Sequence, residues 1–160
     1  MKYYLPELLY PSECISKAEE EIVQRKLREN MQKYHEEYVL IRERLPKRFI
    51  HNLEKGKLHD AQIKEISLKE EQQGKKKLIT VKILLEHDCF NLLGNLIFYD
   101  VVDFKMDQKN DKNRSGIGSY LYGEIFVKEN IWEYNMLTMG DELGELNIYC
   151  HKIKWEPVKR

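Results

Sequence analysis

The spacing of apolar residues changes near residue 58 and divides the chain into a helical part and a strand-forming part. Before this point, apolar residues recur at steps of mostly three and four, the period of one face of an α-helix. The helix is expected to begin at about Ser12 or Ser16, and Ser16 is followed by Glu19 three residues later, the spacing of a capping box. The pattern predicts a helix of about 45 Å, long enough for one end to project or to pack on another subunit. The stripe comprises Ala18, Ile22, Leu27, Met31, Tyr34, Tyr38, Ile41 and Leu45.

A second, shorter helix is expected between this stripe and residue 58. Pro46 suits the first helical position, and Gly56 can adopt the left-handed conformation that ends a helix. Between them, apolar side chains follow at helical spacing, at Phe49, Ile50 and Leu53. Residues 1–15 are rich in Tyr, Leu and Pro, and this apolar density predicts an extended arm that packs on the body of the protein.

After residue 58 the apolar period becomes two, which is typical of β-strands. Strand-like segments cover residues 63–68, 78–85, 96–106, 117–127, 131–139 and 145–155. Because short turns and no helical patterns separate them, we expect antiparallel pairing by hairpins. The prediction is a single α+β domain over 1–160. In it, the arm and helices of 1–57 pack on a curved antiparallel meander of five to seven strands in 58–160.

Charge and cysteine content indicate which class of partner and which cellular compartment to expect. Lys plus Arg and Asp plus Glu both number 27 and are mixed along the chain, which weighs against a nucleic-acid partner. Cys14, Cys89 and Cys150 are odd in number and far apart, as is typical of reduced thiols. The sequence shows neither a signal-peptide core nor an apolar run that could span a bilayer. We therefore expect a cytoplasmic location and no membrane partner.

His59 and Asp60 lie at the predicted helix-to-strand junction, where side chains can point into a cleft or cap a neighbouring backbone. A His-Asp pair with an upstream histidine, here His35, resembles the signature of metal-dependent phosphohydrolases. In those enzymes several helices supply the ligands, whereas the residues after Asp60 alternate as a strand, so the structural context disagrees. The alternative is structural: His59 packs at the junction, and Asp60 caps a turn through backbone N–H groups.

A second group of potential metal ligands is the run His87-Asp88-Cys89. Consecutive residues of a strand point to opposite faces, so at most two of these side chains could converge. The sequence also contains no glycine-rich phosphate loop before a helix and no G-x-S-x-G nucleophile turn. We therefore predict no metal site and no cofactor.

Glu124 lies in the middle of a predicted strand with aromatic neighbours on the same face, at Tyr120, Tyr122 and Phe126. A carboxylate among aromatic rings is costly to bury unless it is paired. We expect His59 or a Lys or Arg of the long helix as its partner. Such an acid could serve general acid–base catalysis, and the alternatives are a structural pair or an exposed aromatic binding face.

Three short motifs resemble a bacterial domain-of-unknown-function family found mostly in Firmicutes. They are Leu45-Pro46, Leu58-His59-Asp60-Ala61 and Tyr120-Leu121-Tyr122-Gly123-Glu124-Ile125. The family has no established activity, so the resemblance implies no catalytic residues. It implies that four residues belong together in space as a candidate functional cluster, namely His59, Asp60, Tyr122 and Glu124. Small bacterial α+β proteins of similar type include immunity proteins, which neutralise a toxin by binding it.

Two hypotheses of function follow. The first is a non-enzymatic protein-binding protein, immunity-like or homodimeric, which uses a tyrosine-rich sheet face or the long helix. The ten tyrosines of the chain favour it, because tyrosine is enriched at interfaces. The second is a small-molecule hydrolase that uses His59, Asp60 and Glu124 in one cleft. We favour the first, with a protein partner that the sequence does not identify.

Overall fold

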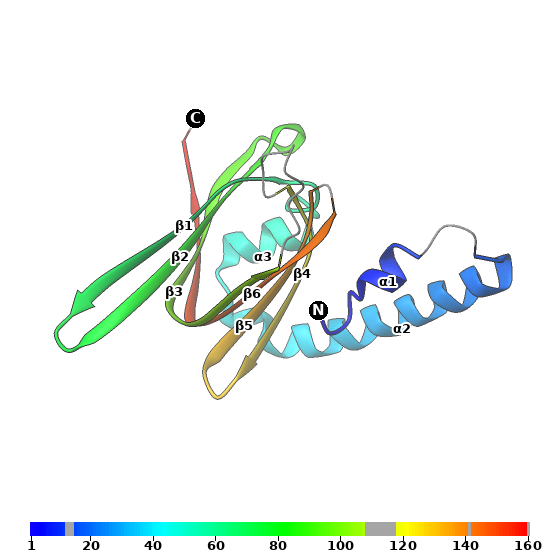
Figure 1. Ribbon diagram of the computed structural model, residues 1–160, viewed down its shortest axis with the longest axis horizontal. Coiled ribbons are helices and arrows are strands. Elements are labelled where there is room, and N and C mark those ends of the chain that lie inside the picture. The colour runs from blue at the N-terminus through cyan, green and yellow to red at the C-terminus, as the bar shows by residue number, and fades with distance from the viewer. Residues whose placement is uncertain (12–14, 108–117, 141, 160) are drawn as a thin grey trace.

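The computed structural model describes residues 1–11, 15–107, 118–140 and 142–159, and it confirms the predicted α+β class (Figure 1). The helical elements are α1 (Pro6–Leu9), α2 (Lys17–Ile41), the 3-10 turn η1 (Arg42–Arg44), α3 (Lys47–Glu54) and the 3-10 turn η2 (Asp88–Phe90). The strands are β1 (Gln62–Gln73), β2 (Lys76–His87), β3 (Leu92–Asp107), β4 (Ser119–Lys128), β5 (Ile131–Met139) and β6 (Leu143–Pro157).

The long helix α2 begins as its sequence predicts and contacts the sheet near its C-terminal end. The Ser16 side chain accepts a hydrogen bond from the Glu19 backbone N–H, and the Glu19 carboxylate accepts one from the Ser16 backbone, which completes the capping box. The buried residues of α2 are Tyr34 and Tyr38, whereas Ile22 and Met31 of the predicted stripe are 43% and 44% exposed. The first part of α2 therefore extends away from the sheet, with α1 beside it (Figure 1).

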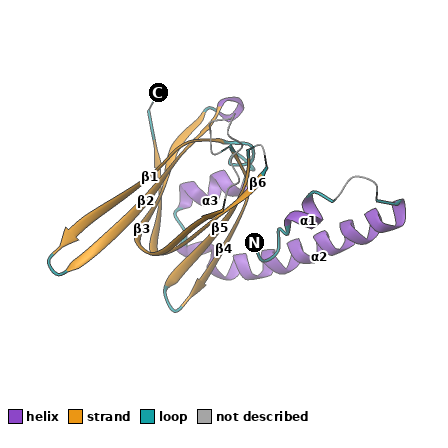
Figure 2. Ribbon diagram, viewed as in Figure 1, coloured by secondary structure: helices purple, strands orange, loops and turns teal. Residues whose placement is uncertain are grey.

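The short helix α3 follows Pro46 and ends before Gly56, which has a φ of 66°. Phe49 of α3 is fully buried, and its ring lies 6.2 Å from the Tyr134 ring of β5. In Figure 2, α3 lies within the outline of the sheet, whereas α2 passes beside it. A helix of two turns has little stability alone, so this anchoring phenylalanine, which adds about 1.5–3 kcal/mol when fully buried, holds α3 in place.

All strand pairs are antiparallel, and the six strands close into a barrel in the order β1-β2-β3-β6-β5-β4. Hairpins join β1, β2 and β3, and hairpins also join β4, β5 and β6, as the predicted meander requires. The two groups meet through β3 and β6 instead of through β3 and β4, and this pairing is the longest in the sheet. Closure follows because a strongly twisted six-strand sheet can bring its two edges, β1 and β4, together.

The closing seam between β1 and β4 is short. One register pair, Gln62 with Ser119, joins the two strands. Beyond it, β1 and β2 leave the barrel as a projecting two-stranded ribbon (Figure 1). The rest of the β4 edge is therefore not covered by β1, and other parts of the chain must satisfy its backbone groups.

The core fills the barrel interior with inward-facing side chains of all six strands, including Ile83, Leu85, Leu96, Phe98, Ile125, Met136 and Leu146. Gly94 permits a close contact at one end, because a Cβ atom there would lie 2.3 Å from the Trp155 ring. Cys89 and Cys150 are free thiols, and Cys14 lies outside the described residues. Across the described ranges, none of the helices is both long and apolar enough to cross a membrane.

Candidate functional site

The Leu58–Ala61 junction completes the barrel seam by pairing with β4. The Asp60 backbone N–H donates to the Tyr120 carbonyl at 2.8 Å, and the Tyr120 N–H donates to the Ala61 carbonyl at 2.8 Å. Asp60 has a φ of 62°, a left-handed conformation that Asp tolerates better than most residues. This turn places His59 beside Tyr122 of β4.

Three of the four residues of the candidate cluster lie together at this seam. The His59 Nδ1 atom lies 3.0 Å from the Asp60 carboxylate. The His59 ring meets the Tyr122 ring edge-to-face, with centroids 5.1 Å apart. The side chains of His59 and Asp60 are 44% and 64% exposed, so this contact is accessible to solvent.

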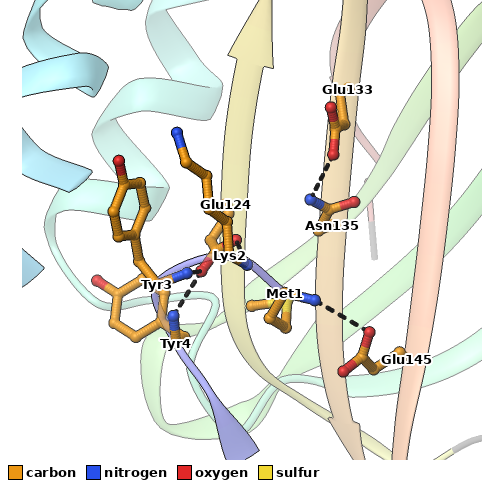
Figure 3. Close-up of polar contacts among 8 residues, drawn as sticks. All are labelled: Met1, Lys2, Tyr3, Tyr4, Glu124, Glu133, Asn135 and Glu145. Carbon is orange, nitrogen blue, oxygen red and sulfur yellow. Dashed lines mark hydrogen bonds and ion pairs between the residues drawn. The ribbon is translucent and has the colours of Figure 1, made fainter. Parts of the chain in front are cut away.

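Glu124, the fourth residue, takes part in a different contact (Figure 3). Its side chain is fully buried, and both carboxylate oxygens accept hydrogen bonds from backbone N–H groups of the N-terminal arm. The donors are Lys2 at 2.6 Å and Tyr3 and Tyr4 at 2.5 Å each. The expected partners, His59 or a cation of the long helix, are thus replaced by main-chain groups. Three such bonds can compensate the loss of water around a buried carboxylate.

The contacts around Glu124 fix the arm over the outer face of β4. The Lys2 ammonium lies 2.8 Å from the Glu37 carboxylate of α2, and the Tyr3 hydroxyl donates to the same carboxylate at 2.6 Å. The Asn30 side-chain amide donates to the Tyr3 carbonyl at 3.2 Å. The aromatic face of β4 is consequently covered by α2 and the arm, and it does not form the exposed tyrosine-rich sheet face that the sequence allowed.

Tyr34 satisfies backbone groups of the uncovered β4 edge. Its hydroxyl accepts a hydrogen bond from the Ile125 N–H at 3.1 Å and donates to the Gly123 carbonyl at 3.4 Å. These two groups flank Glu124 and are the kind that a neighbouring strand would normally bind. A side chain of α2 therefore takes the place of a strand at this point.

A cavity of about 240 Å³ lies between β4, α2, the end of α3 and the junction. We call it the tyrosine cavity, because six aromatic side chains line it: Tyr4, Tyr34, Tyr38, His59, Tyr120 and Tyr122. Five of these rings follow one another in contact. The centroid distances are 6.0 Å from Tyr38 to Tyr34, 5.5 Å from Tyr34 to Tyr4, 5.0 Å from Tyr4 to Tyr122 and 5.1 Å from Tyr122 to His59.

Glu54 contributes the carboxylate of the tyrosine cavity. It accepts hydrogen bonds from the Arg42 guanidinium at 2.5 and 2.9 Å and from the Tyr38 hydroxyl at 3.2 Å. The Arg42 hydrogen bonds lower the pKa of Glu54, so this carboxylate is ionised at neutral pH. Burial, and then the neighbouring Glu54 charge, raise the pKa of the Tyr38 phenol, which stays protonated.

A second cavity, of about 410 Å³, lies at the barrel end beside α3 and has the opposite charge. We call it the basic cavity, because Lys47, Arg48, His51 and Lys57 line it together with Phe90 and Trp155. Within the part of the chain that the structure describes, Asp and Glu do not line it. Residues 47–57 contain four Lys or Arg and one Glu, a local excess of cations that the even charge balance of the whole chain conceals.

The other candidate residues are placed without a shared centre. The His87 ring packs on Phe90 at 4.7 Å, and Cys89 is exposed. In residues 1–11, 15–107, 118–140 and 142–159, the His, Cys, Asp and Glu side chains form no group of three that could hold a metal ion. No family model matches the chain, and no curated protein matches it either.

Proposed function

We propose that the protein is a non-enzymatic protein-binding protein whose tyrosine cavity receives a group from its partner. The observation that carries the proposal is the continuous wall of five aromatic rings around a solvent-accessible cavity. Aromatic pockets of this kind anchor binding partners, because tyrosine offers a large rigid surface with a polar tip. An immunity protein, which acts by binding a toxin, is one example of the class.

The chemistry of the lining supports binding rather than a reaction. Among the described residues, no Ser, Thr or Cys lines the tyrosine cavity, so the lining offers none of these as a nucleophile. Glu124 already accepts three backbone hydrogen bonds and holds the arm. Both of its carboxylate oxygens are therefore engaged in holding the arm, and Glu124 is not one of the residues that line the cavity.

A hydrolase is a second candidate, and one observation favours it. The contact between His59 and Asp60 could orient the imidazole, so that its other nitrogen would activate a water molecule at the mouth of the cavity. Purified protein and the His59→Ala variant should be compared on chromogenic esters and phosphate esters. Turnover that disappears in His59→Ala would favour this candidate over the first.

The test of the first proposal is capture from the native host with a tagged copy of the protein. Three baits are compared: the wild type, Tyr122→Leu in the cavity, and Tyr99→Leu as a matched control on β3. We expect one stoichiometric protein with the wild type and with Tyr99→Leu, and its loss with Tyr122→Leu. Absence of a stoichiometric partner, or its full retention by a folded Tyr122→Leu bait, would contradict the proposal.

A further inference from the structure

We propose that the tyrosine cavity binds an organic cation, that is, an alkylammonium or guanidinium group. This inference rests on the proposed function, because it names the chemistry of the group that the cavity receives. Three properties of the cavity lead to it: the nature of its walls, the charges that line it and its size.

The walls present ring surfaces that attract cations. The face of a tyrosine ring carries partial negative charge, and a cation within about 6 Å of the ring centroid is held electrostatically. Tyr38, Tyr34, Tyr4 and Tyr122 all line this one cavity of about 240 Å³ and are joined by centroid distances of 5.0–6.0 Å, so a group that fills the cavity contacts several tyrosine side chains. Tyr120 adds a sixth aromatic side chain to the lining.

The charges of the lining favour a cation over an anion. Glu54 is a carboxylate of the lining, and within the described residues no Lys or Arg lines this cavity. Arg42 offsets part of the Glu54 charge from outside, so the ring faces supply most of the attraction. The Asp60 carboxylate lies 3.0 Å from the Nδ1 atom of His59, which lines the cavity, so a second carboxylate lies beside the lining. The basic cavity on the other side of α3 has the complementary lining and would attract anions instead.

The size of the cavity limits the ligand to a small group. Pockets for drug-sized molecules usually measure about 300–1,000 Å³, and the tyrosine cavity, at about 240 Å³, is smaller. It can hold the head of a choline-like molecule or the end of a Lys or Arg side chain. Both sources share one chemistry, and the protein-binding function makes a side chain of the partner the source that we expect.

The experiment uses the intact protein and four probes: choline, its uncharged carbon analogue 3,3-dimethylbutan-1-ol, and blocked tripeptides with a central lysine or arginine. Calorimetry and NMR titration give the dissociation constants. We expect the charged probes to bind about tenfold more tightly than the neutral analogue, a factor between those of exposed and desolvated cation–π contacts. Tighter binding of a tripeptide than of choline assigns the source to a protein side chain, and the reverse order assigns it to a small molecule. Either order supports the proposal.

Variants at Tyr122 separate the ring from its hydroxyl group. Tyr122→Leu should weaken binding of the best charged probe about tenfold, whereas Tyr122→Phe, which keeps the ring, should stay within about threefold. Tyr99→Leu on β3 should leave the dissociation constant unchanged. If Tyr122→Leu does not fold, transferred nuclear Overhauser effects from the probe methyl or methylene protons to tyrosine ring protons in the wild type give the same information.

Equal binding of the neutral analogue, or no saturable binding of any charged probe, would overturn the cation proposal. The probes are free molecules, so this outcome is independent of the capture of a partner. If no charged probe binds but a partner is captured in a Tyr122-dependent way, the cation proposal is refuted and the protein-binding function is retained. If the charged probes bind but no partner is captured, the cation site is supported and the protein-binding function is refuted.

Discussion

Glu124→Gln is the change that tests most sharply how the fold is held around the tyrosine cavity. The carboxylate of Glu124 accepts one backbone N–H bond at one oxygen and two at the other. Glutamine keeps one acceptor oxygen. Its NH₂ group faces the remaining backbone N–H group or groups and cannot accept a hydrogen bond from them. The variant therefore loses one or two bonds to a charged group, each worth about 1.5–3 kcal/mol, and we expect a loss of about 2–5 kcal/mol.

The N-terminal arm limits this loss, because residues 1–4 can leave β4 and bind water instead. The cost cannot exceed the stabilisation that docking of the arm provides, which favours the lower half of the range. Undocking also predicts a local signature. The amide protons of Tyr3 and Tyr4 should exchange much faster in Glu124→Gln than in the wild type, while those of the β3 and β6 ladder keep their order of protection.

The assay is urea unfolding followed by circular dichroism, together with amide hydrogen exchange. With a slope of about 1–3 kcal/mol per molar urea, a loss of about 2–5 kcal/mol lowers the midpoint by about 0.7 M or more. Glu156→Gln is the matched control, because Glu156 contacts Lys154 on the exposed surface and its loss should be too small to measure. An unchanged midpoint together with unchanged exchange at Tyr3 and Tyr4 would refute the structural role of Glu124.

Three further predictions concern the barrel. Tyr34→Phe leaves a buried β4 amide without an acceptor and should cost about 1–3 kcal/mol in urea unfolding, and a neutral result would contradict the edge-covering role of Tyr34. Gly123→Ala places a Cβ atom 2.2 Å from the Tyr120 hydroxyl oxygen and should lower the free energy of unfolding by about 1–3 kcal/mol. The double variant with Tyr120→Phe lacks this hydroxyl group and should regain most of the loss. Additive losses in the double variant would contradict the clash. Burial raises the pKa of the Cys150 thiol from 9.0 to about 12, so the folded state keeps a proton that the unfolded chain releases. This contribution to stability is complete below about pH 9 and is lost as the pH rises toward 12. Alkylation of the native protein at pH 8 should therefore label Cys89 and spare Cys150. Rapid labelling of Cys150 would contradict this prediction, because it would show that the thiol is accessible.

Local sequence signals predicted the helices and strands because those signals act over a few residues. Ser16 and Glu19 form the capping box that their spacing indicates, and Gly56 has the left-handed φ that ends α3. The alternating segments became six antiparallel strands. Closure of the barrel was not predictable, because it depends on which distant strand edges meet. The pairing of β3 with β6 does not alter the alternation of apolar and polar residues in either strand.

The candidate site shows the same division between local and distant effects. His59, Asp60 and Tyr122 meet because the junction pairs with β4. Glu124 was expected to need a partner, and it has three, but they are backbone groups about 120 positions away. Every residue except proline carries such a donor, so the type of side chain at positions 2–4 could not reveal them.

The most direct test of the central claim, that the tyrosine cavity is a binding site, is an NMR titration of protein with ¹³C-labelled tyrosine rings. With choline or the lysine tripeptide, the resonances of Tyr4, Tyr38 and Tyr122 should shift along one common saturation curve. Those of Tyr99 and Tyr149, which lie elsewhere on β3 and β6, should stay in place. Absence of any shift at the cavity tyrosines, or equal shifts at Tyr99, would contradict the claim.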